Sequence, residues 1–221
     1  MSVRSAPHSE AELLARAHAL AGVTLGELAS TLGVTLPSDL RRHKGVIGEL
    51  LEAALGASAG ARPVPDFEQL GIELKTVPLG ANERPRESTH VCTVALGDLL
   101  GQRWADSTVR RKLARVLWVP IAATPTLPLA ARRIGAARLW SPAAVEERVL
   151  AADWEEHMEL LATGRFDEID GRLGTWLQVR PKAANGAALV AASDADGRPA
   201  ATLPRGFYLR AAFTARILAP S

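Results

Sequence analysis

Two carboxylates and one ammonium group lie within a short segment, at Asp66, Glu73 and Lys75. Residues 72–77 alternate apolar and polar side chains, which predicts a half-buried strand. Because residues two apart on a strand share a face, Glu73 and Lys75 should point the same way while their apolar neighbours face the core. Gly71 marks a turn that can fold Asp66 back toward Glu73.

Such a cluster suits the hydrolysis of a phosphate ester. Carboxylate oxygens are the ligands that Mg²⁺ prefers, and Mg²⁺ is usually held by one or two acids together with a phosphate. A lysine beside the metal can stabilise or deprotonate the attacking water. Glu52, in the second half of an expected helix, could reach the cluster as a third acid.

The order of these residues is similar to the nuclease motif P-D…(D/E)-x-K of restriction-type endonucleases. Pro65 and Asp66 supply its first half, and Glu73 to Lys75 supply its second. A pattern this short also arises by chance. The alternative is an ordinary amphipathic strand that carries a surface Glu–Lys pair.

Composition sets the broad class of the protein. The chain has 221 residues, 48% of them hydrophobic and 23% charged, as expected for one globular domain. No apolar run reaches the length of a membrane span, and Cys92 is the single cysteine, so we expect a cytoplasmic protein without disulfides. The net charge of +2 is too small for a protein that coats polyanions indiscriminately.

Lysine is rare in this chain. Of 26 basic residues only four are lysines, namely Lys44, Lys75, Lys112 and Lys182. Arginine cannot replace lysine where a compact or deprotonatable charge is needed, so these positions are candidates for chemistry. The alternative is drift within an arginine-rich composition.

The remaining pattern predicts the elements that position these residues. Helices are expected over 9–22, 24–33, 47–55 and 142–162, and strands over 72–77, 88–95, 116–119 and 175–180. We expect the second strand to run antiparallel to the first, and Pro120 to end the third. The outer face of the last helix is acidic and should face solvent, through Glu146, Glu147, Glu155, Glu156 and Glu159.

Four segments could contact nucleic acid. Residues 41–48 and 103–115 are basic, as phosphate-binding surfaces are, although a solvated helix surface has the same composition. Residues 181–186 and 203–210 form polar loops with side chains suited to reading base edges.

Taken together, several blocks resemble the MutH family of DNA mismatch-repair endonucleases, in the same order and over nearly the whole chain. These blocks are Thr24–Ala29, Leu55–Gly60, Gly71–Thr76, Arg115–Trp118, Arg180–Asn185 and Leu203–Leu209. The resemblance implies an α/β, restriction-endonuclease-like fold with a mixed sheet flanked by helices. Residues 1–221 would form one domain whose two lobes enclose a cleft for double-stranded DNA.

The resemblance also implies an activity. The family uses Mg²⁺ to nick the unmethylated strand of hemimethylated GATC sites, 5′ of the G, and is activated by MutL after MutS finds a mismatch. We therefore expect a monomer that binds DNA and no membrane. Two rivals remain: a restriction-type endonuclease that cuts both strands at GATC, and a non-catalytic, methylation-sensitive DNA-binding module. The complete set of acids and lysine argues against the second rival.

Individual roles follow from the family's motif positions. Asp66, Glu73 and Glu52 match its metal site, Lys75 its catalytic lysine and Lys112 a second lysine important for cleavage. Other positions match DNA-contacting residues, namely Lys44, Gly45, Arg180, Pro181 and Lys182. Tyr208 matches the residue that senses adenine methylation. His90 departs from the pattern, because a family member has Phe at that position.

Overall fold

The computed structural model describes residues 4–37, 45–60, 62–97, 99–182, 189–193 and 198–219. They form two compact units. Unit 1 takes its residues from Met1–Glu87, Ala114–Ser141 and Ile217–Ser221, and unit 2 from Ser88–Leu113 and Pro142–Arg216. No helix within these ranges is both long and apolar enough to cross a bilayer.

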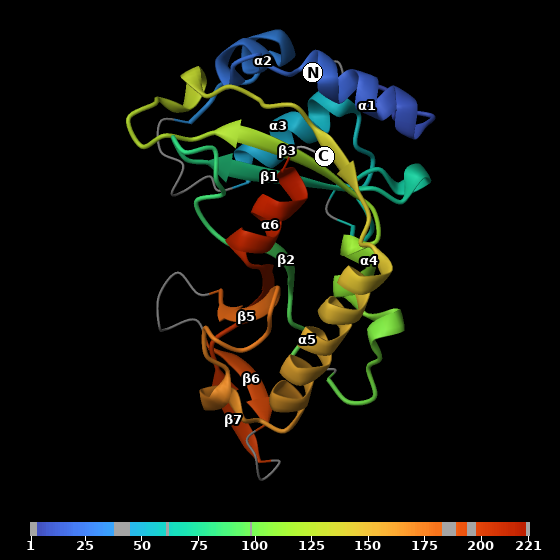
Figure 1. Ribbon diagram of the computed structural model, residues 1–221, viewed down its shortest axis with the longest axis vertical. Coiled ribbons are helices and arrows are strands. Elements are labelled where there is room, and N and C mark those ends of the chain that lie inside the picture. Colours follow the sequence, from blue (N-terminus) through green and yellow to red (C-terminus); the bar gives the residue numbers. More distant parts are fainter. Residues whose placement is uncertain are drawn as a thin grey trace. The chain divides into compact units, whose positions relative to one another are not determined.

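Unit 1 is a mixed sheet with helices on one side (Figure 1). Its elements are α1 (Glu10–Ala19), α2 (Leu25–Leu32), α3 (Val46–Leu55), η1 (Glu68–Leu70), β1 (Glu73–Leu79), β3 (Val116–Ala122), η3 (Leu129–Ala131) and β4 (Arg138–Trp140). Strand β1 runs parallel to β3, and β3 runs antiparallel to β4. The mixed sheet expected from the sequence is therefore confirmed.

The core of unit 1 lies between the helices and the sheet. Leu13, Leu51, Leu55, Ile72 and Leu117 are fully buried there. The predicted helix starts are confirmed, since the Ser9 and Thr24 hydroxyls accept hydrogen bonds from backbone N–H groups three residues later. This packing fixes α3, which carries Glu52, against β1, which carries Glu73 and Lys75.

Gly56 ends α3 and cannot be replaced without strain. Its φ is +85°, and a Cβ atom there would lie 2.4 Å from Ser5 O. The Arg16 guanidinium fills the same corner, donating hydrogen bonds to Ser5 O at 2.7 Å and Leu55 O at 2.9 Å. The end of α3 thus depends on a residue without a side chain.

We expect Gly56→Ala to lower the free energy of unfolding by about 2–4 kcal/mol, measured by denaturant titration. Gly22→Ala is the matched control, because Gly22 has a φ of +84° but nothing within 4 Å of its added Cβ. The control should lose only about 1 kcal/mol, from backbone strain alone. Equal losses in the two variants would show that the contact with Ser5 is unimportant.

Unit 2 is built on an antiparallel sheet in the order β2–β8–β5, with a separate hairpin β6–β7 (Figure 1). Its elements are β2 (Thr89–Thr93), η2 (Trp104–Asp106), α4 (Thr108–Leu113), α5 (Ala144–Ala162), η4 (Phe166–Glu168), β5 (Leu177–Pro181), β6 (Val190–Ser193), β7 (Pro199–Thr202), β8 (Arg205–Leu209) and α6 (Ala211–Leu218). Helix α5 packs on β5, and α4 packs on β2.

Two strand predictions were wrong. The strand after β1 in sequence does not pair with it, because β1 pairs in parallel with β3 and β2 pairs with β8. Pro120 does not end β3, which continues to Ala122. Proline removes a donor but keeps its acceptor, and Pro120 O accepts a hydrogen bond from Gly135 N at 2.8 Å.

Two predictions at the start of α5 were also wrong. The helix begins at Ala144, after the cap residue Ala143, whereas a start at residue 142 was expected. Glu146 is only 8% exposed and does not face solvent with its acidic neighbours. Its carboxylate accepts from Ala143 N at 2.9 Å and lies 3.5 Å from the Arg216 guanidinium, so it satisfies the helix terminus.

Candidate active site and DNA-contact residues

A tight reversal of the chain places Asp66 beside the start of β1. Phe67 and Ile72 bridge across the turn, and Gly71 closes it with a φ of +65°. The Asp66 carboxylate then accepts a hydrogen bond from Leu74 N at 2.7 Å. The predicted fold-back at Gly71 is confirmed.

Glu73 and Lys75 form an ion pair on one face of β1. Lys75 Nζ lies 2.7 Å from Glu73 Oε1, and the two side chains are only 14% and 3% exposed. Leu74, between them, is buried in the core on the side of the helices. In the parallel ladder Lys75 pairs with Trp118, which is fully buried. The pair is largely shielded from water.

Glu52 lies within electrostatic reach of this pair. It is half-buried near the end of α3, and burial raises the pKa of its carboxyl group. The negative charges of Asp66, Glu49 and Glu73 raise this pKa further, while Lys75 opposes them. The structure therefore brings together all four residues predicted for catalysis in unit 1.

These side chains are not arranged as a finished metal site. Among the described residues, no three His, Cys, Asp or Glu side chains stand ready to hold an ion. Glu73 is engaged by Lys75, and Asp66 by Leu74 N. The donor set nevertheless fits Mg²⁺, because its oxygens are hard ligands and a divalent cation would offset the repulsion that raises the pKa of Glu52. A bound ion would have to replace some of the internal contacts.

The predicted DNA-contact residues of unit 2 lie on or directly after two neighbouring strands of its sheet, β5 and β8. The Arg180 guanidinium lies 6.0 Å from the centre of the Tyr208 ring, and the His90 ring meets the same tyrosine edge-on at 5.1 Å. Lys182 donates from Nζ to Thr93 Oγ1 at 2.7 Å. Pro181, Arg180 and Lys182 are exposed, as residues that read DNA must be.

The structure leaves the roles of three further predicted residues untested. Lys44 lies outside the described residues. Gly45 is exposed at the start of α3 in unit 1. Lys112 is partly buried on α4 and belongs to unit 2, whereas the carboxylates belong to unit 1. Roles for these three stay predictions.

Similar sequences are found both as a family model and as nearly full-length relatives. Residues 55–153 match the family model described as DNA mismatch repair enzyme MutH. The chain is 52% identical to the DNA mismatch repair protein MutH of Vibrio parahaemolyticus over 96% of its length and 94% of that protein. For the MutH proteins of Vibrio cholerae (strain O395) and Klebsiella pneumoniae (strain 342), identity is 51% and 53%, over 98% and 97% of this chain and 98% and 93% of theirs.

The chain belongs to the MutH family. The mixed α/β, restriction-endonuclease-like fold expected from the sequence is thereby confirmed. Sequence reasoning missed two residues beside the MutH-like acid cluster, Glu49 and Trp118. The sequence did carry a signal for Glu49, because it lies three residues before Glu52 and residues three apart share a helix face. The sequence carried no signal for Trp118, because its pairing with Lys75 depends on the parallel register of β1 and β3.

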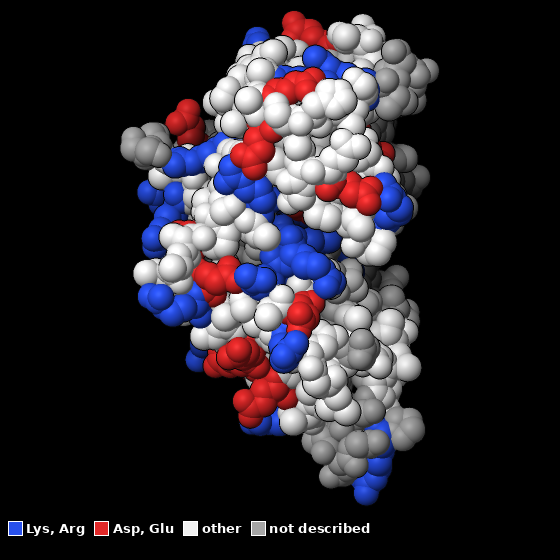
Figure 2. Space-filling view, turned by 90° about the vertical axis from the view of Figure 1, so that its right-hand side faces the viewer, with Lys and Arg blue, Asp and Glu red and all other residues white. Residues whose placement is uncertain are grey.

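The basic segment 103–115 of this MutH family member is largely neutralised by its own acids. Arg103 pairs with Asp106 at 2.7 Å, and Arg110 pairs with Glu147 at 2.6 Å. Arg115, in unit 1, pairs with Glu10 at 2.6 Å. Figure 2 shows both basic and acidic side chains over the described part of one face. DNA phosphates would have to compete for these arginines.

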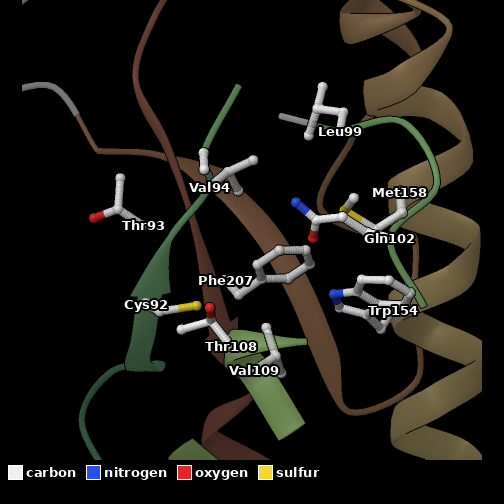
Figure 3. A pocket seen from close by; sticks show the side chains of 11 residues that line it. Cys92, Thr93, Val94, Leu99, Gln102, Thr108, Val109, Trp154, Met158 and Phe207 are labelled. Atoms are coloured by element: carbon white, nitrogen blue, oxygen red, sulfur yellow. The ribbon is translucent and has the colours of Figure 1, made fainter. Parts of the chain in front are cut away.

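A cavity of about 50 Å³ lies inside unit 2 (Figure 3). Phe207 of β8 lies between Cys92 of β2 and the side chains of Trp154 and Met158 on α5. None of the predicted site residues that the structure describes lines it. It has room for about one or two waters, well below the roughly 300 Å³ of small-molecule sites, so we assign it to packing.

Proposed function

We propose that this protein is a Mg²⁺-dependent endonuclease of DNA mismatch repair. It nicks the unmethylated strand of hemimethylated GATC sites on the 5′ side of the G. The observation that carries the proposal is the gathering of Asp66, Glu73, Glu52 and Lys75 in unit 1, in a chain of the MutH family.

Asp66, Glu73 and Glu52 would hold the ion. When bound, Mg²⁺ supplies Lewis-acid stabilisation of the charge that develops on the scissile phosphate. Lys75 orients the attacking water, because its amine is held at Glu73 and is largely shielded from solvent. Water attacks phosphorus in line, a new P–O bond forms, and the bond to the 3′ oxygen breaks. That oxygen leaves with the proton that the attacking water gives up.

The DNA-contact residues of β5 and β8 would read the site. Arg180 and Lys182 are exposed donors suited to base edges, and Lys44 and Gly45 would approach the backbone. Tyr208, packed under Arg180, would meet the adenine methyl group. Lys112 would serve as a second lysine for cleavage. Units 1 and 2 would act together as one endonuclease domain over residues 1–221.

Partners follow from the family resemblance. We propose that MutL activates the protein in the cytoplasm after MutS has found a mismatch, and that the protein acts as a monomer. A nicking assay with and without MutL tests the first part, with faster nicking expected when MutL is present.

Strand and methylation preference test the proposed activity directly. Strand-labelled GATC duplexes are incubated with Mg²⁺ in hemimethylated, unmethylated and fully methylated form. We expect a nick in the unmethylated strand of the hemimethylated duplex and an intact fully methylated duplex. Double-strand cleavage of the unmethylated duplex without MutL would favour a restriction enzyme. Binding without cleavage in all three would favour a methylation reader.

A further inference from the structure

The segment just before β5 is held on its N–H side by one buried carboxylate. Asp153 on α5 is only 5% exposed. Its Oδ1 accepts from Thr175 N at 2.7 Å, and its Oδ2 accepts from Trp176 N at 2.7 Å and Leu177 N at 2.8 Å. A carboxylate offers two oxygens with about four acceptor positions, which no neutral side chain of its size matches.

The carbonyl side of the same segment is held by one guanidinium. Arg210, directly after β8, donates to Gly171 O at 2.9 Å, Leu173 O at 2.7 Å and Gly174 O at 2.9 Å. Its own backbone N donates to Trp176 O at 2.8 Å. Asp153 and Arg210 thus clamp residues 171–177 from both sides with opposite charges.

Gly174 shows how closely the clamped segment is folded. Its φ is +75°, and an added Cβ would lie 2.0 Å from Leu177 O and 3.1 Å from the His157 ring. The backbone conformation at Gly174 is therefore tightly restricted where the chain enters β5.

This entry point sets the register of the strand that carries the proposed DNA-reading residues. Leu177, the last clamped residue, pairs with Leu209, and the ladder continues to Arg180 opposite Gly206. Side chains alternate along a strand, so a slip of one residue would turn Arg180 to the opposite face. The clamp lies at one end of β5 and Arg180 at the other.

We propose that Asp153 and Arg210 are positioning residues for sequence recognition, acting through the register of β5. The inference rests on the proposed function, because it assumes that Arg180 and its neighbours contact DNA. In this proposal Asp153 and Arg210 affect which DNA sequence is bound and take no part in the hydrolysis.

The test is Asp153→Asn, with Glu156→Gln as control, because Glu156 is an exposed acid on the same helix. The asparagine keeps one acceptor oxygen and points an N–H₂ group at the backbone donors. We expect KM for a GATC duplex to rise about tenfold and kcat to stay unchanged. The preference for GATC over a duplex with one altered base pair should fall. The control should match the wild type.

A merely structural role predicts a different result, with fewer active molecules, a lower kcat, and an unchanged KM and sequence preference. That result would overturn the proposal. If Asp153→Asn does not fold, as judged by circular dichroism, Arg210→Lys replaces it, since it keeps the charge but loses the fork of donors. Unfolding of both variants would make the clamp a folding element and would also overturn the proposal.

Failure of the proposed function is distinguishable from failure of this inference. If the wild type does not nick DNA, its affinity for a GATC duplex and for a scrambled duplex is compared by fluorescence anisotropy. The clamp predicts that Asp153→Asn reduces this ratio. An unchanged ratio of the affinities for the GATC and scrambled duplexes overturns the positioning role, whatever the result of the nicking assay.

Discussion

Lys75→Ala should reduce the nicking rate by about 10²–10⁴-fold at saturating Mg²⁺ while leaving DNA affinity nearly unchanged. The ammonium group is held 2.7 Å from Glu73 and is largely shielded from water, so no surface lysine can replace it. Single-turnover nicking of a hemimethylated duplex measures the rate, and anisotropy measures binding. Separating the two readouts is essential, because lysines also bind phosphate.

Two controls define the result for Lys75. Arg62→Ala removes an exposed cation of the same unit, with a side chain 55% exposed, and should leave nicking unchanged. Lys75→Arg keeps the charge but replaces a compact ammonium with a larger planar fork of donors, so it should misplace the water and be nearly as slow as the alanine variant. A Lys75→Ala protein that still nicks at the wild-type rate would remove Lys75 from the mechanism.

Glu73→Gln should cause a loss of nicking greater than about 100-fold, together with a weaker response to Mg²⁺. The substitution keeps the shape of a side chain that is 3% exposed but removes the charge that pairs with Lys75. Nicking as a function of Mg²⁺ concentration is the measurement. Glu68→Gln, an acid 43% exposed at the turn before β1, is the control and should behave as the wild type.

The double variant Glu73→Gln/Lys75→Ala sharpens this test. Residues that act as one unit show strongly non-additive losses, so the double variant should be little slower than the slower single variant. Losses that multiply would mean that Glu73 and Lys75 act independently, contrary to the ion pair described above.

The local arrangement of the acid cluster was predictable because it depends on short-range rules. Strand alternation placed Glu73 and Lys75 on one face, and Gly71 supplied the left-handed turn that returns Asp66 to β1. The helix of Glu52 was also readable from its apolar spacing. What could not be read was the pairing of strands distant in the sequence.

Long-range pairing explains the wrong predictions. The partner of β1 is β3, some forty residues later, so Trp118 beside Lys75 was invisible to local patterns. The register of β2 against β8 shifts between His90 and Cys92, which local patterns also do not reveal. Asp153 drew no notice because its partners, the N–H groups of residues 175–177, carry no sequence signal.

The most direct test of the account is to locate a bound divalent ion. Crystals of the protein with a nicked hemimethylated GATC duplex and Mn²⁺, which gives an anomalous signal, would be collected near the manganese edge. The account predicts an anomalous peak between about 2.0 and 2.6 Å from carboxylate oxygens of Asp66 and Glu73, with Glu52 close by. A fully occupied manganese elsewhere, with none at these acids, would contradict it.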